Sequence, residues 1–120
     1  MGVYVFVYGT LRIGEVRHRV IQDCEFVGMA YAEGYDLYLI SNFPGIVPGS
    51  GKVVGEVYRV PEERFQRLDQ IEGAPYLYRR ELIKVKLDTG EELETYTYIY
   101  NHSVDGLEKI PSGDWKKFWR

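Results

Sequence analysis

The sequence predicts an α+β fold in which a small, mostly antiparallel β-barrel of about six strands carries two or three short helices on its outside. Six short runs are rich in β-branched and aromatic residues, and most of them follow one another through glycine-containing turns. Only two or three segments have the spacing of apolar residues that a helix needs. The length of 120 residues suits a single domain, which we expect to span residues 1–120.

The predicted strands are short, and the first of them is apolar on both faces. Residues 3–8 are β-branched or aromatic at every position, which is typical of a strand buried inside a sheet or barrel. Gly34 separates two of the later strands, and a hairpin turn is expected at residues 88–90. Residues 41–51 contain two prolines and three glycines, a composition that predicts a loop. The strands after the first are expected at residues 26–33, 35–40, 53–60, 79–87 and 91–100.

Three segments are candidates for short helices. Residues 61–72 form the clearest one, because Pro61 fits a first helical position and Gly73 fits the position just beyond the last turn. Residues 16–23 fit a short surface helix with apolar residues on one side. Residues 110–120 are rich in aromatic side chains and fit a helix packed back on the barrel.

Composition and charge exclude several classes of function. Fifteen basic residues oppose 18 acidic ones, giving a net charge of −3 and a pI near 5.4, so we expect no nucleic-acid partner. One cysteine and two isolated histidines supply few ligands, and we expect no metal site. No apolar run approaches the roughly 20 residues that span a bilayer, and the first residues lack the pattern of a secretory signal. We therefore expect a cytoplasmic protein without a membrane partner.

The strongest candidate for catalysis is Glu72, at the end of the predicted helix. Phe65 and Leu68 lie three residues apart on its apolar face, and helical geometry puts Glu72 between them on that face. A buried carboxylate beside the negative end of the helix dipole should have a raised pKa, as a general base near neutral pH requires. The alternative is that the helix frays and Glu72 reaches solvent or pairs with Arg79 or Arg80.

A second candidate is the turn that follows the first strand, at residues 8–11. A buried strand that stops at a glycine leaves successive backbone N–H groups without partners, and these can form a cradle for an anion or a carbonyl oxygen. Gly9 lets a ligand come close because it has no Cβ. An ordinary strand-ending turn explains the same pattern. The segment is not a phosphate-binding loop, since it matches neither Gly-x-x-x-x-Gly-Lys-Ser/Thr nor Gly-x-Gly-x-x-Gly.

Other residues that could carry chemistry have simpler interpretations. Cys24 lacks a flanking motif and is expected to be a small buried apolar residue. His18 and His102 are expected at the surface, and no spacing joins them as metal ligands. Three tyrosines alternate along the last strand and should line one face, as core or barrel wall: Tyr96, Tyr98 and Tyr100.

Several segments resemble one known family. Residues 5–12 read Val-Phe-Val-Tyr-Gly-Thr-Leu-Arg, and residues 68–73 read Leu-Asp-Gln-Ile-Glu-Gly. These segments resemble the γ-glutamylcyclotransferase-like proteins, and most of all the γ-glutamylamine cyclotransferase branch. A Tyr-Gly-Thr-Leu strand end followed about sixty residues later by a helix-terminal glutamate is quite specific. The resemblance runs from about residue 3 to residue 100, and four further segments keep the family's order: 18–20, 48–51, 55–58 and 77–80.

The resemblance implies a small antiparallel barrel with outer helices and a cavity at one end. Enzymes of this family release 5-oxoproline from γ-glutamyl compounds without a metal or cofactor, so the implied partner is a small γ-glutamyl molecule. The family's catalytic glutamate matches Glu72. Tyr78 is a further candidate for placing the α-amine or α-carboxylate of the substrate. The family's substrate-cradling loop matches four residues of the predicted turn: Tyr8, Gly9, Thr10 and Leu11.

The resemblance, together with these residues, therefore implies a cyclotransferase acting on γ-glutamyl amines or γ-glutamyl amino acids. Glu72 would serve as general base and then as general acid while the substrate's own α-amine attacks the γ-carbonyl. One alternative is a non-catalytic barrel that binds a γ-glutamyl-like or carboxylate metabolite. Another is acyl transfer to water or to a second amine. Residues 41–51 and the tail after Asn101 depart from the family, so the leaving amine stays open, as does the oligomeric state.

Overall fold

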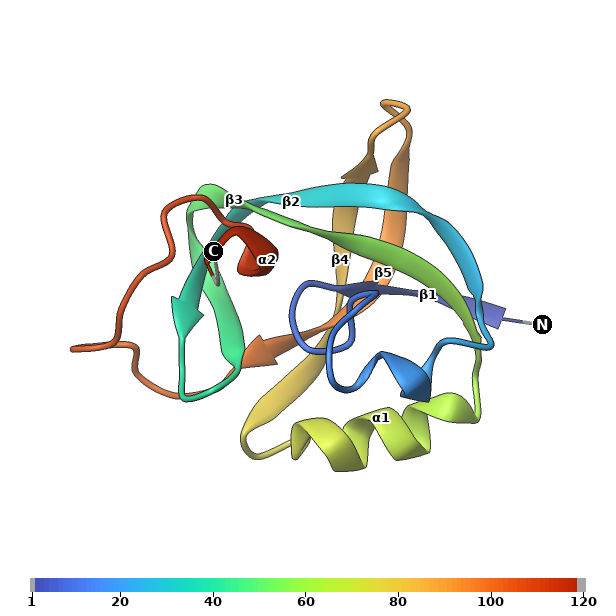
Figure 1. The fold of residues 1–120 in the computed structure, drawn as a ribbon, viewed down its shortest axis with the longest axis horizontal. Helices are drawn as coiled ribbons and strands as arrows, with labels where there is room; N and C mark the ends of the chain where they lie inside the picture. Colours follow the sequence, from blue (N-terminus) through green and yellow to red (C-terminus); the bar gives the residue numbers. More distant parts are fainter. Residues whose placement is uncertain (1, 119–120) are drawn as a thin grey trace.

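The computed structural model describes residues 2–118 and shows a closed β-barrel with helices packed outside it (Figure 1). The strands close in the order β1-β3-β2-β4-β5, and every pair is antiparallel except the parallel contact of β1 with β5. The predicted α+β fold with a mostly antiparallel barrel is confirmed, with five strands in place of about six. The five are β1 (Gly2–Val7), β2 (Glu25–Leu39), β3 (Pro44–Pro61), β4 (Tyr78–Leu87) and β5 (Glu92–Tyr100).

Three short helical segments accompany the barrel. The first is η1 (His18–Val20), a single 3₁₀ turn, so most of the surface helix predicted at residues 16–23 is irregular. Helix α1 (Arg64–Glu72) lies across the lower side of the barrel in Figure 1. Helix α2 (Trp115–Phe118) covers part of the last predicted helix, whose residues 119–120 lie outside the described residues.

Strand β2 runs unbroken through the glycine at which the sequence predicted a break. Gly34 has a φ of 88° and lies at a register shift between Glu33 and Tyr35 in the ladder of β2 with β3. An irregularity of this kind bends paired strands without ending them. The strands predicted at residues 26–33 and 35–40 are therefore one strand, which explains the lower strand count.

The loop predicted at residues 41–51 is also wrong for most of its length. Strand β3 already begins at Pro44, which is tolerated because the first residue of a strand can lack a ladder N–H. A Cβ on Gly49 would clash with a carboxylate oxygen of Asp36 on the neighbouring strand. That glycine therefore permits the close approach of Asp36 and does not mark a turn.

Helix α1 begins three residues later than predicted and ends where predicted. Pro61 pairs with Gly2 as the last residue of β3, so it belongs to the strand and the helix starts at Arg64. At the other end Gly73 has φ 66° and ψ 32°, the left-handed conformation that closes a helix. This C-terminal cap is confirmed, and it makes Glu72 the last helical residue.

The apolar core has two parts, and β1 separates them. Phe6 and Tyr8 point into one cluster of buried side chains. Val5 and Val7 point into the other cluster, which also contains Leu68 of α1. The prediction that the first strand is apolar on both faces is therefore confirmed, and α1 packs against one of those faces.

The alternating tyrosines of β5 form part of the wall that faces α1. Tyr98 is buried in the cluster that contains Leu68, and Tyr96 and Tyr100 pack against the same cluster. The ring of Tyr96 lies 5.2 Å from the ring of Phe65 of α1 in an edge-on arrangement. The three tyrosines thus share one face, as predicted from their spacing.

Of the cysteine and the two histidines, only His102 is exposed, and the other two side chains are half-buried. His102 is exposed, as predicted. His18 is half-buried, with its Nδ1 2.9 Å from the carbonyl oxygen of Leu11. Cys24, predicted to be a small buried apolar residue, is only half-buried, and its Sγ accepts a 3.4 Å contact from the guanidinium of Arg64.

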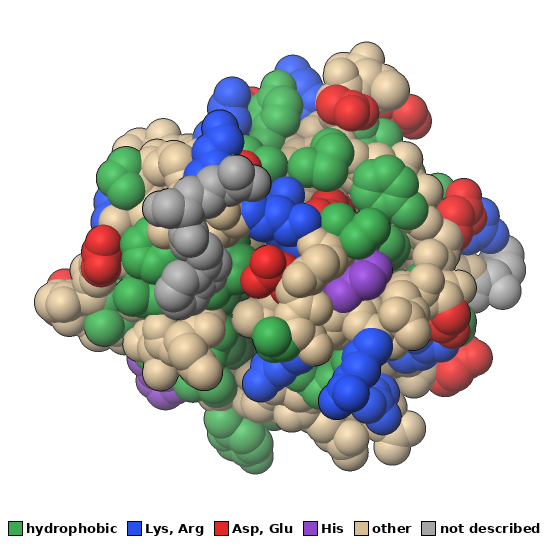
Figure 2. Space-filling view, in the orientation of Figure 1, with side chains coloured by type: hydrophobic (Ala, Val, Ile, Leu, Met, Phe, Trp, Pro, Cys, Tyr) green, Lys and Arg blue, Asp and Glu red, His purple; other side chains and the backbone are tan. Residues whose placement is uncertain are grey.

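The surface carries charges of both signs. Figure 2 shows basic and acidic side chains scattered among apolar ones over one face of the molecule, in keeping with 15 basic and 18 acidic residues. Within residues 2–118, no helix has the length and apolar character needed to cross a membrane.

Candidate active site

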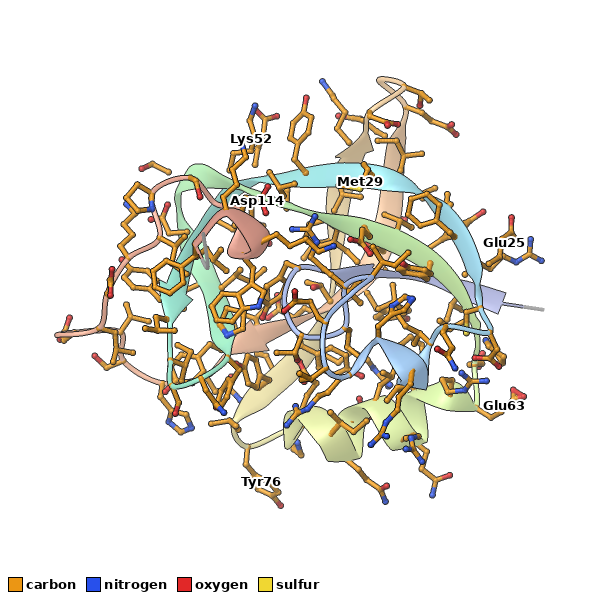
Figure 3. The ribbon with its side chains drawn as sticks, viewed as in Figure 1. Glu25, Met29, Lys52, Glu63, Tyr76 and Asp114 are labelled. Atoms are coloured by element: carbon orange, nitrogen blue, oxygen red, sulfur yellow. The ribbon has the colours of Figure 1, made fainter. Side chains whose placement is uncertain are left out.

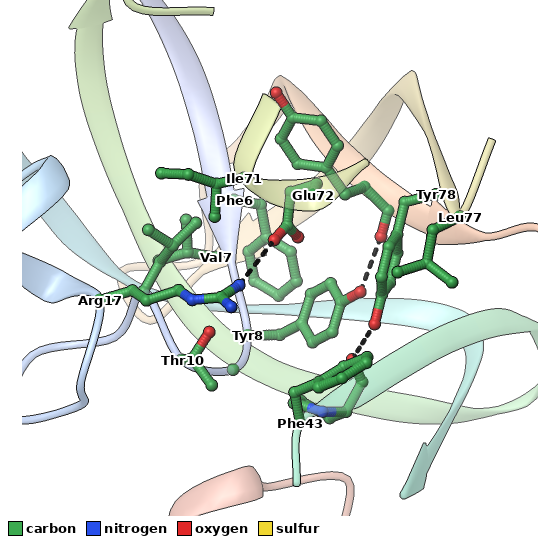
Figure 4. A pocket seen from close by; sticks show the side chains of 14 residues that line it. Phe6, Val7, Tyr8, Thr10, Arg17, Phe43, Ile71, Glu72, Leu77 and Tyr78 are labelled. Atoms are coloured by element: carbon green, nitrogen blue, oxygen red, sulfur yellow. Dashed lines mark hydrogen bonds and ion pairs between the residues drawn. The ribbon is translucent and has the colours of Figure 1, made fainter. Parts of the chain in front are cut away.

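A pocket opens where the end of β1 meets the end of α1 (Figure 4). It encloses about 80 Å³, and its walls are largely apolar and aromatic. The structure therefore brings together the turn and the carboxylate that the sequence singled out, although the two lie far apart in the chain. All six predicted site residues line it: Tyr8, Gly9, Thr10, Leu11, Glu72 and Tyr78.

Glu72 supplies the carboxylate of the pocket. Its side chain is only 15% exposed and points into the pocket from the end of α1 (Figure 4). Burial raises the pKa of Glu72 to about 7, against the opposing effect of the Arg17 guanidinium, whose Nη1 lies 3.9 Å from Glu72 Oε2. The alternative pairing of Glu72 with Arg79 or Arg80 does not occur, since both of those arginines bind other carboxylates.

The turn after β1 contributes backbone donors. Within the described part of the chain, the N–H groups of Gly9, Thr10 and Leu11 donate to no protein acceptor. The turn is held instead through its carbonyls, since Gly9 O accepts a 3.0 Å hydrogen bond from Arg12 N–H. A Cβ on Gly9 would lie 2.5 Å from Cγ of Pro44, so the approach of the turn to β3 requires a glycine. Such a run of unused N–H groups can bind an anion or a carbonyl oxygen.

Two buried tyrosines form the floor of the pocket. Tyr8 donates its hydroxyl hydrogen to the carbonyl of Tyr98 at 2.7 Å, and Tyr78 donates to the carbonyl of Pro44 at 2.5 Å. Burial raises the pKa of both phenols, and the nearby Glu72 carboxyl adds to the rise. Both therefore stay neutral, and each hydroxyl oxygen still has lone pairs with which to accept a hydrogen bond.

Several residues that line the pocket were missed by the sequence reasoning. Arg17 lies in the segment predicted as a surface helix, and no spacing connects it with Glu72. Phe43 comes from the predicted loop before β3. Ile71 and Leu77 could have been found, because they flank the helix end and the start of β4.

A buried network of charges fixes the far end of the turn and was also missed. Arg12, 3% exposed, donates from Nε to Glu56 Oε2 at 3.0 Å and from Nη1 to Asp114 Oδ1 at 2.8 Å. Glu56, 1% exposed, also accepts from the N–H of Ile13 at 3.0 Å and the hydroxyl of Tyr58 at 2.8 Å. Since Asp114 stands beside α2 (Figure 3), the network ties the turn to β3 and α2.

The pocket thus offers a carboxyl group, a guanidinium, two phenols and free backbone N–H groups. This set can move protons, bind opposite charges side by side and stabilise an oxyanion. Among residues 2–118, no three His, Cys, Asp or Glu side chains gather to hold a metal ion. That no metal or cofactor takes part stays a prediction.

Comparison with known protein families gives a match over most of the chain. The family described as "Gamma-glutamyl cyclotransferase, AIG2-like" matches residues 5–117. The gamma-glutamylcyclotransferase family protein YtfP of Escherichia coli K12 is 35% identical over 111 residues, covering 92% of this chain and 94% of that protein. Human gamma-glutamylaminecyclotransferase is 40% identical over 94 residues, covering 69% of this chain and 61% of that protein.

Solved structures share the fold. The uncharacterized protein PH0828 of Pyrococcus horikoshii superposes with a TM-score of 0.79 at 34% identity, covering 98% of this chain and 92% of that one. An AIG2-like protein of Mus musculus superposes with a TM-score of 0.81 at 27% identity, covering 95% and 94%. The likeness therefore extends over nearly the whole barrel.

Proposed function

The chain belongs to the γ-glutamyl cyclotransferase, AIG2-like family, and we propose that it releases 5-oxoproline from γ-glutamyl amines or γ-glutamyl amino acids. The observation that carries this proposal is the largely buried carboxyl of Glu72 in a pocket that is also lined by a turn whose N–H groups have no protein partner within the described residues. A group with a pKa of about 7 can take a proton and return it near neutral pH.

In the proposed reaction the nucleophile belongs to the substrate. Glu72 removes a proton from the substrate's α-ammonium, and the freed amine attacks the γ-carbonyl carbon of the same glutamyl group. A new C–N bond closes a five-membered lactam, and the bond from the γ-carbon to the leaving amine breaks. Glu72 then gives its proton to the departing amine. The ring nitrogen, which still carries two hydrogens after the attack, loses one of them to the regenerated Glu72 carboxylate, and that proton passes to the released amine or to solvent. Because the attack is intramolecular, holding the substrate in a folded conformation accounts for much of the acceleration.

The turn after β1 is assigned the developing oxyanion. The carbonyl oxygen becomes negatively charged as the amine attacks, and the N–H groups of Gly9, Thr10 and Leu11, which line the pocket, have no protein acceptor within residues 2–118. One such donor is worth about 3 kcal/mol of transition-state stabilisation in comparable sites.

The two tyrosines are assigned to placing the substrate. Tyr78 already donates its hydrogen to Pro44, so its oxygen is left to accept a hydrogen bond from the substrate's α-ammonium. Tyr8 is anchored to the carbonyl of Tyr98 and presents its ring to the pocket as a rigid wall. Neither tyrosine needs to ionise in this scheme.

The test is a product screen with one matched pair of variants. Purified protein is incubated with γ-glutamyl amines, γ-glutamyl dipeptides and glutathione, and 5-oxoproline is followed by mass spectrometry. We expect Glu72→Gln to lower kcat roughly 10²- to 10⁴-fold, the usual contribution of a general acid–base. Glu63→Gln, at the exposed start of α1, is the control and should keep wild-type turnover.

The other outcomes separate the alternatives. Turnover by Glu72→Gln at the wild-type rate would remove Glu72 from the mechanism. Binding of a γ-glutamyl compound with no lactam after long incubation would indicate a non-catalytic barrel. Release of free glutamate or a new amide would indicate acyl transfer to water or to a second amine.

A further inference from the structure

The pocket holds one positive and one negative side chain, next to each other. Among the described residues that line it, Arg17 is the only lysine or arginine and Glu72 the only aspartate or glutamate. Their closest atoms are 3.9 Å apart, beyond hydrogen-bonding distance. The Arg17 side chain is 44% exposed, so the guanidinium stands at the pocket mouth and faces inward toward the carboxyl (Figure 4).

Arg17 differs from three arginines that bind carboxylates closely, and Arg59, whose loose 4.0 Å contact with Glu25 is similar, does not line the pocket. Arg12, Arg64 and Arg80 each donate a hydrogen bond to a carboxylate. The guanidinium of Arg17 donates none within the described residues, and its one ion pair is the loose contact with Glu72. Its planar set of N–H donors is therefore available, and that set matches the two oxygens of a carboxylate.

The backbone holds Arg17 in register with the turn. Its N–H donates to the carbonyl oxygen of Thr10 at 2.9 Å. The start of the Arg17 side chain is therefore fixed relative to the N–H groups assigned to the oxyanion, while the guanidinium itself keeps freedom to move. This arrangement suits a guanidinium that binds one end of a small ligand while the N–H groups of the turn bind the other end.

We infer that Arg17 binds the α-carboxylate of the γ-glutamyl group and so makes the pocket specific for substrates that carry it. The inference rests on the proposed function. The α-ammonium and the α-carboxylate of glutamate are attached to one carbon atom, so groups that bind them must lie side by side, as Glu72 and Arg17 do. In this arrangement the substrate's α-carboxylate binds the guanidinium of Arg17, and its α-ammonium binds the carboxylate of Glu72. The γ-carbonyl oxygen then reaches the N–H groups of the turn after β1.

Two substrates with the same leaving amine test the inference. One is a γ-glutamyl amide, and the other is the matching γ-aminobutyryl amide, which keeps the attacking amine and the carbonyl but lacks the carboxylate. The first yields 5-oxoproline and the second yields 2-pyrrolidinone. We expect the wild-type protein to prefer the first in kcat/KM, roughly 10- to 100-fold, as a charge-assisted hydrogen bond allows.

The variants then locate that preference. Arg17→Gln should lose most of the preference, mainly through a higher KM for the γ-glutamyl amide, and Arg17→Lys should keep part of it through its point charge. Arg19→Gln, an exposed neighbour that does not line the pocket, should keep the full preference. Because the Arg17 side chain is partly exposed and not hydrogen-bonded, its loss should leave the melting temperature close to that of the wild type.

Each result decides one question. If the wild-type protein makes 5-oxoproline but Arg17→Gln and Arg17→Lys keep its preference for the carboxylate, the inference is wrong and the proposed function stands. The same holds if both substrates lose kcat/KM equally in Arg17→Gln, since that would reflect an altered Glu72 alone. If the wild-type protein forms neither lactam, the proposed function fails, and the inference with it.

Discussion

Two arginine–glutamate pairs lie at the two ends of one short segment, and they differ in almost every respect. Arg12 and Glu56 are joined by a 3.0 Å hydrogen bond and are nearly inaccessible to solvent. Arg17 and Glu72, at the pocket, approach only to 3.9 Å, and the arginine is 44% exposed. The same two residue types thus form a structural tie at one end of the segment and an open site at the other.

The difference lies in how completely each carboxylate is hydrogen-bonded. Glu56 accepts from Arg12, from the backbone of Ile13 and from Tyr58, which compensates its burial. Glu72 accepts no hydrogen bond from any described residue, since the Arg17 guanidinium stays 3.9 Å away, and the cost of burial appears as a raised pKa. A buried carboxylate with unused lone pairs is suited to proton transfer, whereas a fully bonded one is suited to holding the fold.

Removing the carboxylate of the buried pair should have the largest effect on stability. Glu56→Ala leaves Arg12 buried with only Asp114 to pair with, and breaking a buried pair costs about 3–5 kcal/mol of unfolding free energy. Urea denaturation followed by circular dichroism measures this loss. Glu72→Gln serves as the comparison, and the contrast between the two pairs would be broken if both substitutions cost the same.

The carboxylate of the pocket pair, Glu72, should instead make the free energy of unfolding depend on pH. A carboxyl whose pKa is raised by folding stabilises the protein below the pKa of the unfolded chain and loses that effect as pH rises through the folded value. For Glu72 the window runs from about 4.5 to about 7, and the rise corresponds to about 3 kcal/mol. Glu72→Gln removes this dependence, so it should gain stability relative to the wild type between pH 4.5 and pH 8. Urea denaturation of both proteins at pH 4.5 and at pH 8 measures this gain. If the difference in unfolding free energy between Glu72→Gln and the wild type is the same at both pH values, Glu72 is not buried as described.

The smallest effect is expected at the turn after β1, which directly precedes Arg12 of the buried pair. Gly9→Ala places a Cβ 2.5 Å from Cγ of Pro44, and overpacking of this kind costs about 1–3 kcal/mol of stability. Because the turn must shift, kcat/KM should fall as well, while the buried pair beyond it stays intact. Gly28→Ala is the control, since its Cβ would meet nothing closer than 3.7 Å. A Gly9→Ala protein with full activity would argue against the assignment of the turn to the oxyanion.

Local pattern alone predicted much of the site. The three- and four-residue spacing of Phe65, Leu68 and Glu72 fixed the face of α1 on which the glutamate lies, and Gly73 fixed where the helix ends. The apolar run of β1 and its stop at Gly9 predicted the position of the turn. These features depend on periodicity and capping, which act between neighbours in the chain.

Features that depend on distant neighbours were not predictable in this way. Gly34 is typical of a break between strands. The pairing of β2 with β3 nevertheless continues past it, with only a local register shift. The glycines of residues 41–51 read as a loop, although Gly49 is required by the carboxylate of Asp36 on the adjacent strand. In both places the decisive contact comes from another strand.

By itself, the sequence determined the barrel class, the catalytic candidate and the turn that faces it, because each rests on spacing within one segment. Only the tertiary structure decided that Arg17 lies beside Glu72 and that Arg12 is hydrogen-bonded in a buried network with Glu56. Nothing local distinguishes Arg12 from Arg17, since both are charged residues in an irregular stretch. Arg12 is buried between Glu56 of β3 and Asp114 beside α2, whereas Arg17 lies at the pocket mouth, and that difference in solvent exposure and hydrogen-bond partners separates their roles.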